Sequence, residues 1–338
     1  MGKKHATGPT LVAIDVSAKT LQVAIEAPGE AARDGEFENT AEGHRALLRH
    51  VTKGGGLVRV CLEATGSYSL DVALHLSSHA RVEVMVLNPK AARRFAEAQM
   101  RRAKTDLVDA RSLLEFLRRM PFAPWAQPGP KRLELRGITR RIAALGHDRV
   151  AEKNRLEAAL ATKETPKAVT DDLRNSIASL ERRIEALIDL ALALVHADPE
   201  LSLALECLSS VKGIADRSGI TLLGELLLLP EDMSPDEVVA HCGLDPRPKQ
   251  SGVRDGPRSI SKIGNSVVRG ALFMPALCAA RFEPSVRAFY ERLLARKKVK
   301  FVAIVAVMRR LLRALWVMLL RKTTFDGALF APKSAAAA

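Results

Sequence analysis

Carboxylates inside apolar, strand-like runs are the feature that most constrains how this chain can fold. Asp15 interrupts the β-branched run TLVAIDV, and Glu63 closes a second such run, LVRVCLE. Runs of this length and composition are typical of buried strands. A charged carboxylate is costly to bury unless it is paired or bound to a metal ion. Two of them in core strands therefore predict a shared cation site.

A helical segment farther along the chain adds two more acids. Asp106 and Asp109 lie three residues apart in the helical pattern of 105–119, so their carboxylates share one face. Carboxylate oxygens suit Mg²⁺, and two such ions clamp the attacking and leaving oxygens of a phosphoryl displacement. The four acids together predict a Mg²⁺ site, with Mn²⁺ as a substitute ion. In the alternative interpretation the helical pair is solvated, near Lys104 and Arg111, and Glu63 caps a strand.

The first third of the chain alternates strand and helix patterns. We expect strands near 10–16, 21–27, 57–63 and 82–87, and helices near 41–52, 68–79, 89–99 and 105–119. The short SAKT segment predicts a hairpin between the first two strands, and the later alternation predicts βα crossovers. The result is a mixed α/β sheet whose acids are arranged as in the RNase H-like fold of the RuvC type. Prolines between 121 and 130 then mark a boundary.

The middle of the chain is predicted to be a helical hairpin. The helical pattern from 131 to 197 breaks once, at TKETPK, and its second half has the a/d spacing of a coiled coil. The residues of this seam are Leu173, Ile177, Leu180, Ile184, Leu187, Ala191 and Leu194. Such a seam packs either on its own chain or on a second copy, and the sequence leaves both open.

The last third is mainly helical and contains two informative loops. VKGIADRSGITLLGE resembles a helix-hairpin-helix, whose turn at Lys212 and Gly213 offers backbone N–H groups to a DNA phosphate. The second loop, GLDPRPKQSGVRDGPRSISKIGNSVVRGALF, combines glycines with many cations, which is typical of phosphate contacts. Its cations are Arg247, Lys249, Arg254, Arg258, Lys262 and Arg269.

The charge balance indicates an anionic partner. Lys and Arg number 52 against 38 Asp and Glu, a net charge of +14, which is typical of proteins that bind nucleic acid or an anionic surface. Aromatic residues make up only 4%, which disfavours base-stacking platforms and favours a duplex or a backbone-held strand. Further candidate contacts are Arg101, Arg102, Lys104 and Gly252.

Several other classes of protein are disfavoured. The apolar segment VKFVAIVAVMRRLLRALWVMLL carries Arg309, Arg310 and Arg313 in its middle, which predicts a buried helix and not a membrane span. The four cysteines are far apart and form no CxxC pair, so we expect no zinc site. MGKKHATGPT leads directly into a strand and shows no secretory signal. We therefore expect a cytoplasmic, nucleoid-associated bacterial protein without a membrane partner.

Ser251 is a further candidate catalytic residue. It lies in QSGVRDGPRSISKIGN, among glycines and cations able to hold a phosphate. A serine hydroxyl is a poor nucleophile unless a base or a metal activates it. The loop has no histidine, and His241 fits an ordinary helix residue. Ser251 is thus either a nucleophile activated from another part of the molecule or a turn residue.

Five segments together resemble the DEDD insertion-sequence transposases of the IS one-ten and IS one-eleven-eleven group, which are RNA-guided DNA recombinases. The segments are AIDVSAKTLQVAI, CLEATGSYS, NPKAARRFAEAQMRRAKTDLVDA, VKGIADRSGITLLGE and QSGVRDGPRSISKIGNSVVRGAL. The resemblance covers about 10–325. It implies a RuvC-like catalytic domain at 1–125, a helical coiled-coil insertion at 126–200 and a C-terminal transposase domain at 201–330. We expect a flexible tail at 331–338.

The resemblance also implies roles and partners. Asp15, Glu63, Asp106 and Asp109 match the DEDD metal ligands, and Ser251 matches the nucleophilic serine. An element-encoded noncoding guide RNA would pair with double-stranded donor and target DNA. A homo-oligomer, dimer or tetramer, would compose each active site from two protomers. One departure is Gly213-Ile214-Ala215, where Gly-Ile-Gly is more usual.

The sequence therefore predicts a transposase that cleaves and exchanges DNA strands through a DNA–phosphoserine intermediate. Two alternatives stay open. In one, the chain is a RuvC-like Holliday-junction nuclease that uses water, and Ser251 is a turn residue. In the other, it is a non-catalytic basic nucleic-acid-binding protein whose acids are structural. The Ser-Gly loop favours the recombinase over the nuclease, and the buried position of Asp15 disfavours the non-catalytic protein.

Overall fold

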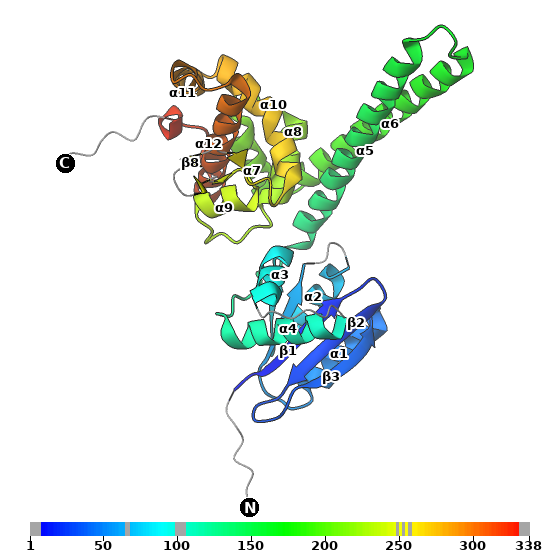
Figure 1. The fold of residues 1–338 in the computed structure, drawn as a ribbon, viewed down its shortest axis with the longest axis vertical. Helices are drawn as coiled ribbons and strands as arrows, with labels where there is room; N and C mark the ends of the chain where they lie inside the picture. The colour runs from blue at the N-terminus through cyan, green and yellow to red at the C-terminus, as the bar shows by residue number, and fades with distance from the viewer. Residues whose placement is uncertain are drawn as a thin grey trace, which may run out of the picture. The chain divides into compact units, whose positions relative to one another are not determined.

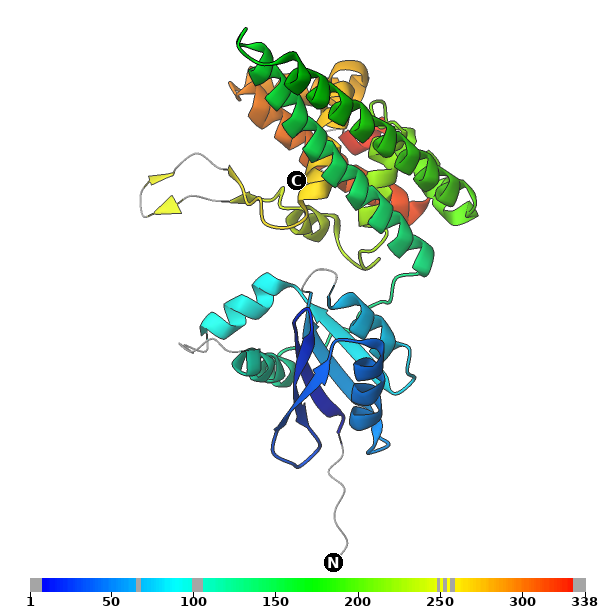
Figure 2. The ribbon, with the colours of Figure 1, turned by 90° about the vertical axis from the view of Figure 1, so that its right-hand side faces the viewer.

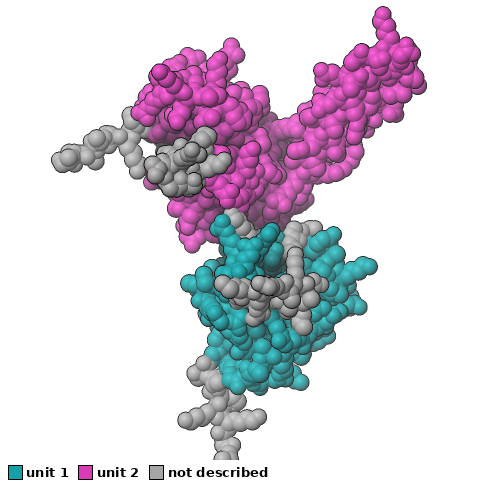
Figure 3. All heavy atoms as spheres, in the orientation of Figure 1, with its two compact units in different colours: residues 1–127 teal, residues 128–338 magenta. Residues whose placement is uncertain are grey.

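The chain divides into two compact units, residues 1–127 and 128–338 (Figure 3). The computed structural model describes residues 8–64, 68–98, 106–247, 250–251, 254–255 and 259–330. The division falls inside the proline-rich stretch of the sequence. Each unit has its own hydrophobic core, and each is described by itself below. A division into three domains with a separate tail stays a prediction.

Unit 1 contains a five-stranded mixed sheet with the order β3-β2-β1-β4-β5. Its strands are β1 (Thr10–Val16), β2 (Thr20–Glu26), β3 (Arg33–Glu38), β4 (Val58–Glu63) and β5 (Val82–Leu87). β2 runs antiparallel to β1 and β3, whereas β1, β4 and β5 are mutually parallel. The mixed α/β sheet predicted from the sequence is confirmed.

Helices cover both faces of this sheet (Figure 2). They are α1 (Ala41–Thr52), α2 (Leu70–Ser77), α3 (Pro89–Ala98) and α4 (Asp106–Arg119). Successive strand residues point to opposite faces, so β1 sends Val12 and Ile14 into one cluster, with residues of α1 and α2. Ala13 goes to the opposite cluster with Ala110 of α4. Burial on both faces explains why β1 reads as an almost continuous apolar run.

The sequence pattern does not predict β3. Its residues, RDGEFE, are mostly polar, and the strand lies at the edge of the sheet. An edge strand needs few apolar side chains because one of its sides faces water. Phe37 packs against the core, and pairing with β2 from Thr20↔Glu38 to Ile25↔Arg33 holds the strand in place. Tertiary pairing therefore decides this element.

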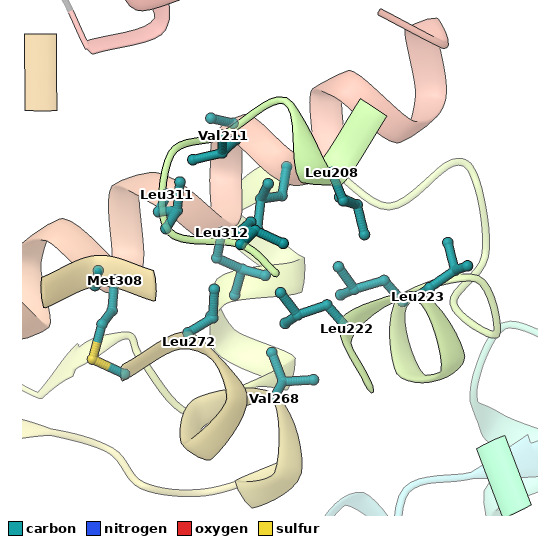
Figure 4. Close-up of a cluster of buried hydrophobic side chains, with 14 of the residues drawn as sticks. Leu208, Val211, Leu222, Leu223, Val268, Leu272, Met308, Leu311 and Leu312 are labelled. Atoms are coloured by element: carbon teal, nitrogen blue, oxygen red, sulfur yellow. The ribbon is translucent and has the colours of Figure 1, made fainter. Parts of the chain in front are cut away.

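Unit 2 is helical apart from short paired strands in one loop (Figure 1). Its helices are α5 (Pro130–Leu160), α6 (Lys167–His196), α7 (Pro199–Ser209), α8 (Asp216–Leu226), α9 (Pro235–His241), α10 (Ser266–Phe282), α11 (Pro284–Ala295), α12 (Lys300–Arg321) and the 3₁₀ turn η1 (Gly327–Phe330). Four of these helices begin at a proline, a residue that fits the first helical turn, where no N–H partner is needed. Leucines and valines of α7, α8, α10 and α12 meet in one core (Figure 4).

The predicted seam of α6 packs within the chain. Ile177, Ile184 and Ala191 are buried, and α6 lies along α5 in an antiparallel hairpin. Leu180 and Leu187 are only half buried. The structure therefore supports the intramolecular interpretation for the buried row, while packing against a second copy stays a prediction.

The apolar segment near the C-terminus forms α12, which is part of the unit 2 core. Its Trp316 is 2% exposed and donates a hydrogen bond from Nε1 to the Met233 carbonyl oxygen at 2.8 Å. Arg313 forms an ion pair with Asp236. Among the residues that the structure describes, no helix has the length and apolar character needed to cross a membrane.

Candidate functional site

Two of the predicted acids lie side by side at the carboxyl ends of two interior strands of the unit 1 sheet. β1 and β4 are adjacent and parallel, and Ile14 pairs with Leu62, so the next residues, Asp15 and Glu63, are neighbours. Ile14 and Leu62 point to the face of the sheet that α1 and α2 cover. Since successive strand residues alternate, Asp15 and Glu63 lie on the opposite face, the face of Ala13. Each side chain is half-buried, and each has interactions within the structure. The carboxyl ends of two core strands thus present two carboxylates together.

Helix α4 covers this same face and runs toward the amino end of β1. Arg118, near the end of α4, donates to Glu26 at 2.6 Å, and Glu26 pairs with Leu11 at the start of β1. Arg111, two turns earlier, donates to Asp34 at 2.9 Å. Asp34 on β3 pairs with a residue of β2 that in turn pairs with Ala13, in the middle of β1. The amino end of α4 therefore points toward the carboxyl end of β1, where Asp15 lies.

The helical period also places the acid pair on one flank of α4. Ala110 packs into the sheet cluster, and Arg111 reaches β3 on one side. Since each residue turns the helix by about 100°, Asp109 lies on the opposite flank, toward β4. Asp106 is the first residue of α4, and its side chain lies outside what the structure describes. The backbone thus brings the start of α4 and the acids Asp15 and Glu63 to one end of the sheet.

These residues provide a donor set that suits a hard divalent cation. All four side chains are carboxylates, which bind Mg²⁺ through oxygen. Burial raises the pKa of the neighbouring Cys61 thiol to about 12, so no thiolate competes on this face. Among the side chains that the structure describes, no group of three or more His, Cys, Asp or Glu residues is arranged to hold a metal ion. The four-acid site therefore stays a prediction, which strand register and helix direction favour.

The loop that carries Ser251 is held at its base. Strands β6 (Pro246–Arg247) and β9 (Ser259–Ile260) pair there, and the Asn265 N–H donates to the His241 carbonyl oxygen at 3.0 Å. A Cβ on Gly264, which has φ +116°, would lie 1.9 Å from that carbonyl oxygen. Glycine is therefore required where the chain returning from the loop meets the end of α9.

Ser251 itself lies in the part of this loop that is farther from the helices, beyond the β6–β9 pair. Strand β7 (Gln250–Ser251) pairs with β8 (Arg254–Asp255), so Ser251 is opposite Arg254. Figure 2 shows this pair apart from the helices of unit 2. The Ser251 and Arg254 side chains lie outside what the structure describes. The same is true of the predicted contacts Arg101, Arg102, Lys104, Lys249, Gly252 and Arg258.

The remaining predicted contacts have mixed environments. Lys212 and Lys262 are exposed, as phosphate contacts must be. Gly213 has φ +104°, and a Cβ there would lie 2.6 Å from the Cys278 Cβ, so the turn packs closely on α10. Arg269 Nη1 donates to the carbonyl oxygens of Cys242 (2.8 Å) and Gly264 (3.3 Å). Arg269 therefore serves, at least with this nitrogen, to hold the base of the loop.

Sequence reasoning did not identify Glu225, the carboxylate that ties this loop to the helices. Glu225 on α8 is 3% exposed and accepts from Arg140 Nε at 2.6 Å and from Asn265 Nδ2 at 2.6 Å. Asn265 also begins α10, since its Oδ1 accepts from the Val267 N–H at 3.0 Å. A lone acid inside the apolar run LLGELLLL is the same signal that singles out Asp15.

Comparison with known proteins finds family models that match parts of both units. A family model described as "Transposase" matches residues 12–163, which include the four acids, and a model described as "Transposase IS116/IS110/IS902 family" matches residues 205–291, which include Ser251. The chain is 28% identical to a pilin gene-inverting protein of Moraxella lacunata, over 80% of this chain and 82% of that protein.

Two further relatives extend the comparison. A pilin gene-inverting protein of Moraxella bovis is 26% identical over 94% of this chain and 98% of its own length. A putative transposase of Sinorhizobium fredii is 28% identical over 68% of this chain and 69% of its own length. The two family models cover more than two thirds of the chain and parts of both units. The chain thus belongs to the IS110 family of transposases, enzymes that cleave and rejoin DNA.

Proposed function

We propose that this transposase mobilises its own insertion sequence by metal-dependent strand exchange, with Ser251 as the nucleophile. The observation that carries the proposal is the register that sets Asp15 beside Glu63 at the carboxyl ends of β1 and β4. The start of α4, with Asp106 and Asp109, lies toward the same end of the sheet. This arrangement supports an RNase H-like, RuvC-type unit 1 whose four acids hold Mg²⁺, with Mn²⁺ as a substitute.

Each residue then has a defined role. Bound Mg²⁺ would polarise the scissile phosphate and neutralise charge that develops on its oxygens. The four acids hold that ion, and Ser251 Oγ attacks the phosphorus while its proton passes to solvent. The Oγ–P bond forms, the bond from phosphorus to the 3′-oxygen breaks, and the released 3′-oxygen takes up a proton.

Strand exchange follows by the reverse reaction on another strand. A 3′-hydroxyl from the partner strand attacks the phosphoserine, which restores a phosphodiester and frees Ser251. Because each step exchanges one phosphate ester for another, the sequence of steps needs no ATP. Ser251 and the acids belong to different units of the chain, and we propose that two protomers of a homo-oligomer supply them.

Nucleic acid is the proposed partner of the cationic residues. Lys212 and Lys262 are exposed, and the net charge of +14 favours binding of phosphates. We propose that the turn at Gly213 acts as a helix-hairpin-helix toward DNA. An element-encoded guide RNA is part of the proposal on the basis of the family resemblance, and it would pair with donor and target DNA.

The names of the relatives favour a recombinase over a nuclease that uses water. Two of them are pilin gene-inverting proteins. Inversion of a DNA segment requires that cut ends be rejoined in a new order, which cleavage by water does not achieve. A covalent serine ester retains the energy of the cut bond for that rejoining.

The test is to trap the covalent intermediate. With DNA substrate and Mg²⁺, wild-type protein stopped before exchange should carry a nucleotide on the peptide that contains Ser251, as seen by mass spectrometry. Ser251→Ala should lose both cleavage and adduct while it still binds DNA. Ser259→Ala, in the same loop, is the matched control and should behave as wild type. Efficient cleavage by Ser251→Ala without an adduct would favour the water-dependent nuclease.

A further inference from the structure

One side-chain amide bridges the two segments that leave the acid-bearing strands. Asn39 Nδ2 donates to the Ser17 carbonyl oxygen at 2.8 Å and to the Tyr68 carbonyl oxygen at 3.1 Å. Ser17 lies two residues after Asp15, and Tyr68 lies five residues after Glu63. Both N–H groups of the amide are therefore used to link the chain beyond β1 to the chain beyond β4.

The orientation of this amide is fixed by a buried histidine. Asn39 Oδ1 lies 2.7 Å from His44 Nε2, and His44 is 5% exposed. Burial, together with the nearby His75, lowers the pKa of His44, which favours a neutral ring. Since the Asn39 Oδ1 can only accept, the proton of that ring lies on Nε2. A flipped amide would turn its oxygen toward two carbonyl oxygens and lose all three hydrogen bonds.

The backbone around Asn39 is also held in place. Its N–H donates to the Lys19 carbonyl oxygen at 2.8 Å, in the turn between β1 and β2. The next residue, Thr40, caps α1, and its Oγ1 accepts from the Gly43 N–H at 3.2 Å. A Cβ on Gly43 would lie 1.9 Å from the Glu38 carbonyl oxygen, so α1 lies close against the end of β3. The amide is thus mounted on a rigid part of the fold.

We propose that Asn39 is a positioning residue that sets the spacing between Asp15 and Glu63 for their shared metal ion. This inference rests on the proposed function of these two acids. Mg²⁺ demands near-ideal coordination geometry, and a misplacement of about 1 Å can reduce an enzymatic rate roughly 100-fold. Strand pairing makes the two acids neighbours. Without the amide, the segments just beyond the strands lose the hydrogen bonds that couple them, and the separation of the two carboxylates is held less tightly.

Asn39→Asp provides the main test, since it keeps the size of the side chain and removes both donors. Its matched control is Thr40→Ala, which weakens the cap of the same helix and leaves the bridge intact. For each protein we would measure thermal unfolding against Mn²⁺ and Mg²⁺ concentration, DNA binding and DNA cleavage. Asn39→Ser, which also lacks the bridging amide, gives the same test if the aspartate variant fails to fold.

We expect the Asn39 variants to need roughly 10-fold more metal for half-maximal thermal stabilisation and to cleave roughly 10- to 100-fold more slowly. DNA binding should stay within about three-fold of wild type, because the phosphate contacts are unchanged. Thr40→Ala should lower the unfolding temperature without changing the metal dependence. A metal dependence that both Asn39 variants share with wild type would overturn the inference.

Two further outcomes separate this inference from the function on which it rests. If Thr40→Ala shifts the metal dependence as much as Asn39→Asp does, the role of Asn39 is merely structural and the inference fails. If Asp15→Ala abolishes cleavage while the Asn39 variants keep wild-type metal dependence, only the inference is lost. If wild-type protein cleaves equally well in EDTA, the metal-dependent function and the inference fail together.

Discussion

The acids of unit 1 and the serine loop of unit 2 are supported in different ways. Asp15 and Glu63 lie on strands whose neighbouring residues are packed in two hydrophobic clusters, one on each face of the sheet. Ser251 lies in a two-residue strand, in a loop that is tied to the helices at its base. Sites on regular elements are more precise than sites on loops. The proposed metal ligands would need that precision, whereas the proposed nucleophile would have to reach a separate strand of DNA.

In each region one polar side chain links separate segments of the chain. We call these two side chains clamps; the clamp near the acids is neutral, and the clamp at the base of the serine loop is charged. Near the acids, the neutral Asn39 amide joins two segments through hydrogen bonds to backbone oxygens. At the base of the serine loop, the buried Glu225 carboxylate binds Arg140 and Asn265. A neutral hydrogen bond contributes about 1 kcal/mol, whereas hydrogen bonds to a charged group contribute about 1.5–3 kcal/mol. The loop base is thus the more costly of the two to disrupt.

The largest expected effect is on cleavage by the acid site. Asp15→Ala should reduce DNA cleavage by at least about 1,000-fold, roughly 4 kcal/mol of transition-state stabilisation, because the metal loses a ligand. Folding should be unaffected, and thermal stability in EDTA should be equal or higher because crowding of like charges is relieved. Asp109→Ala should behave in the same way. Cleavage assays beside circular dichroism test this, and near-normal cleavage by Asp15→Ala contradicts the site.

A large effect on stability is expected at the loop base. Glu225→Ala should destabilise unit 2 by about 1–3 kcal/mol, because Asn265 and the partly exposed Arg140 and Arg136 lose the buried carboxylate that they contact. Asp15→Ala should show no such loss, which is the contrast between the two regions. Denaturant unfolding measures the difference, with the exposed Glu206→Ala as the control. Equal stability of Glu225→Ala and wild type would remove the distinction between the clamps.

The helical hairpin provides a test of whether the seam of α6 packs on α5 of the same chain or on a second copy. Ile184→Asp places a charge at a site that is 2% exposed and should cost about 3 kcal/mol or more. If the seam packs on α5, the variant should unfold or aggregate, as seen by circular dichroism and light scattering. A folded variant that only dissociates into protomers would show that the seam serves the oligomer instead.

The smallest expected effect concerns the cations of the serine loop. Each phosphate contact that is removed should reduce the salt slope of duplex binding by up to about 0.9. Arg254→Ala and Arg258→Ala should each show this change with folding unaffected. Arg59→Ala is a control in unit 1, where Arg59 already pairs with Glu83 at 2.9 Å. An unchanged slope in both loop variants would mean that the loop does not contact phosphates.

The elements with strong apolar periodicity could be predicted from the sequence, and the weakly patterned ones could not. β1, β4 and β5 and the helices of the hairpin lie close to their expected positions because burial demands long apolar patterns. β3 escaped prediction because an edge strand needs few buried side chains. Glu225 carries a detectable signal, a lone acid inside an apolar run. Asn39 carried none, since a polar residue before a helix cap is common in any sequence.

The sequence alone determined the chemical identities in this protein: acids inside strand-like runs, a serine among glycines and cations, and a basic charge excess. It could do so because side-chain chemistry and apolar period are local properties of the chain. The tertiary structure decided which of these groups become neighbours. The parallel pairing of β1 with β4 places Asp15 beside Glu63, and the direction of α4 brings its first turn toward them. Strand order and helix direction follow from packing between distant segments, which no local pattern encodes.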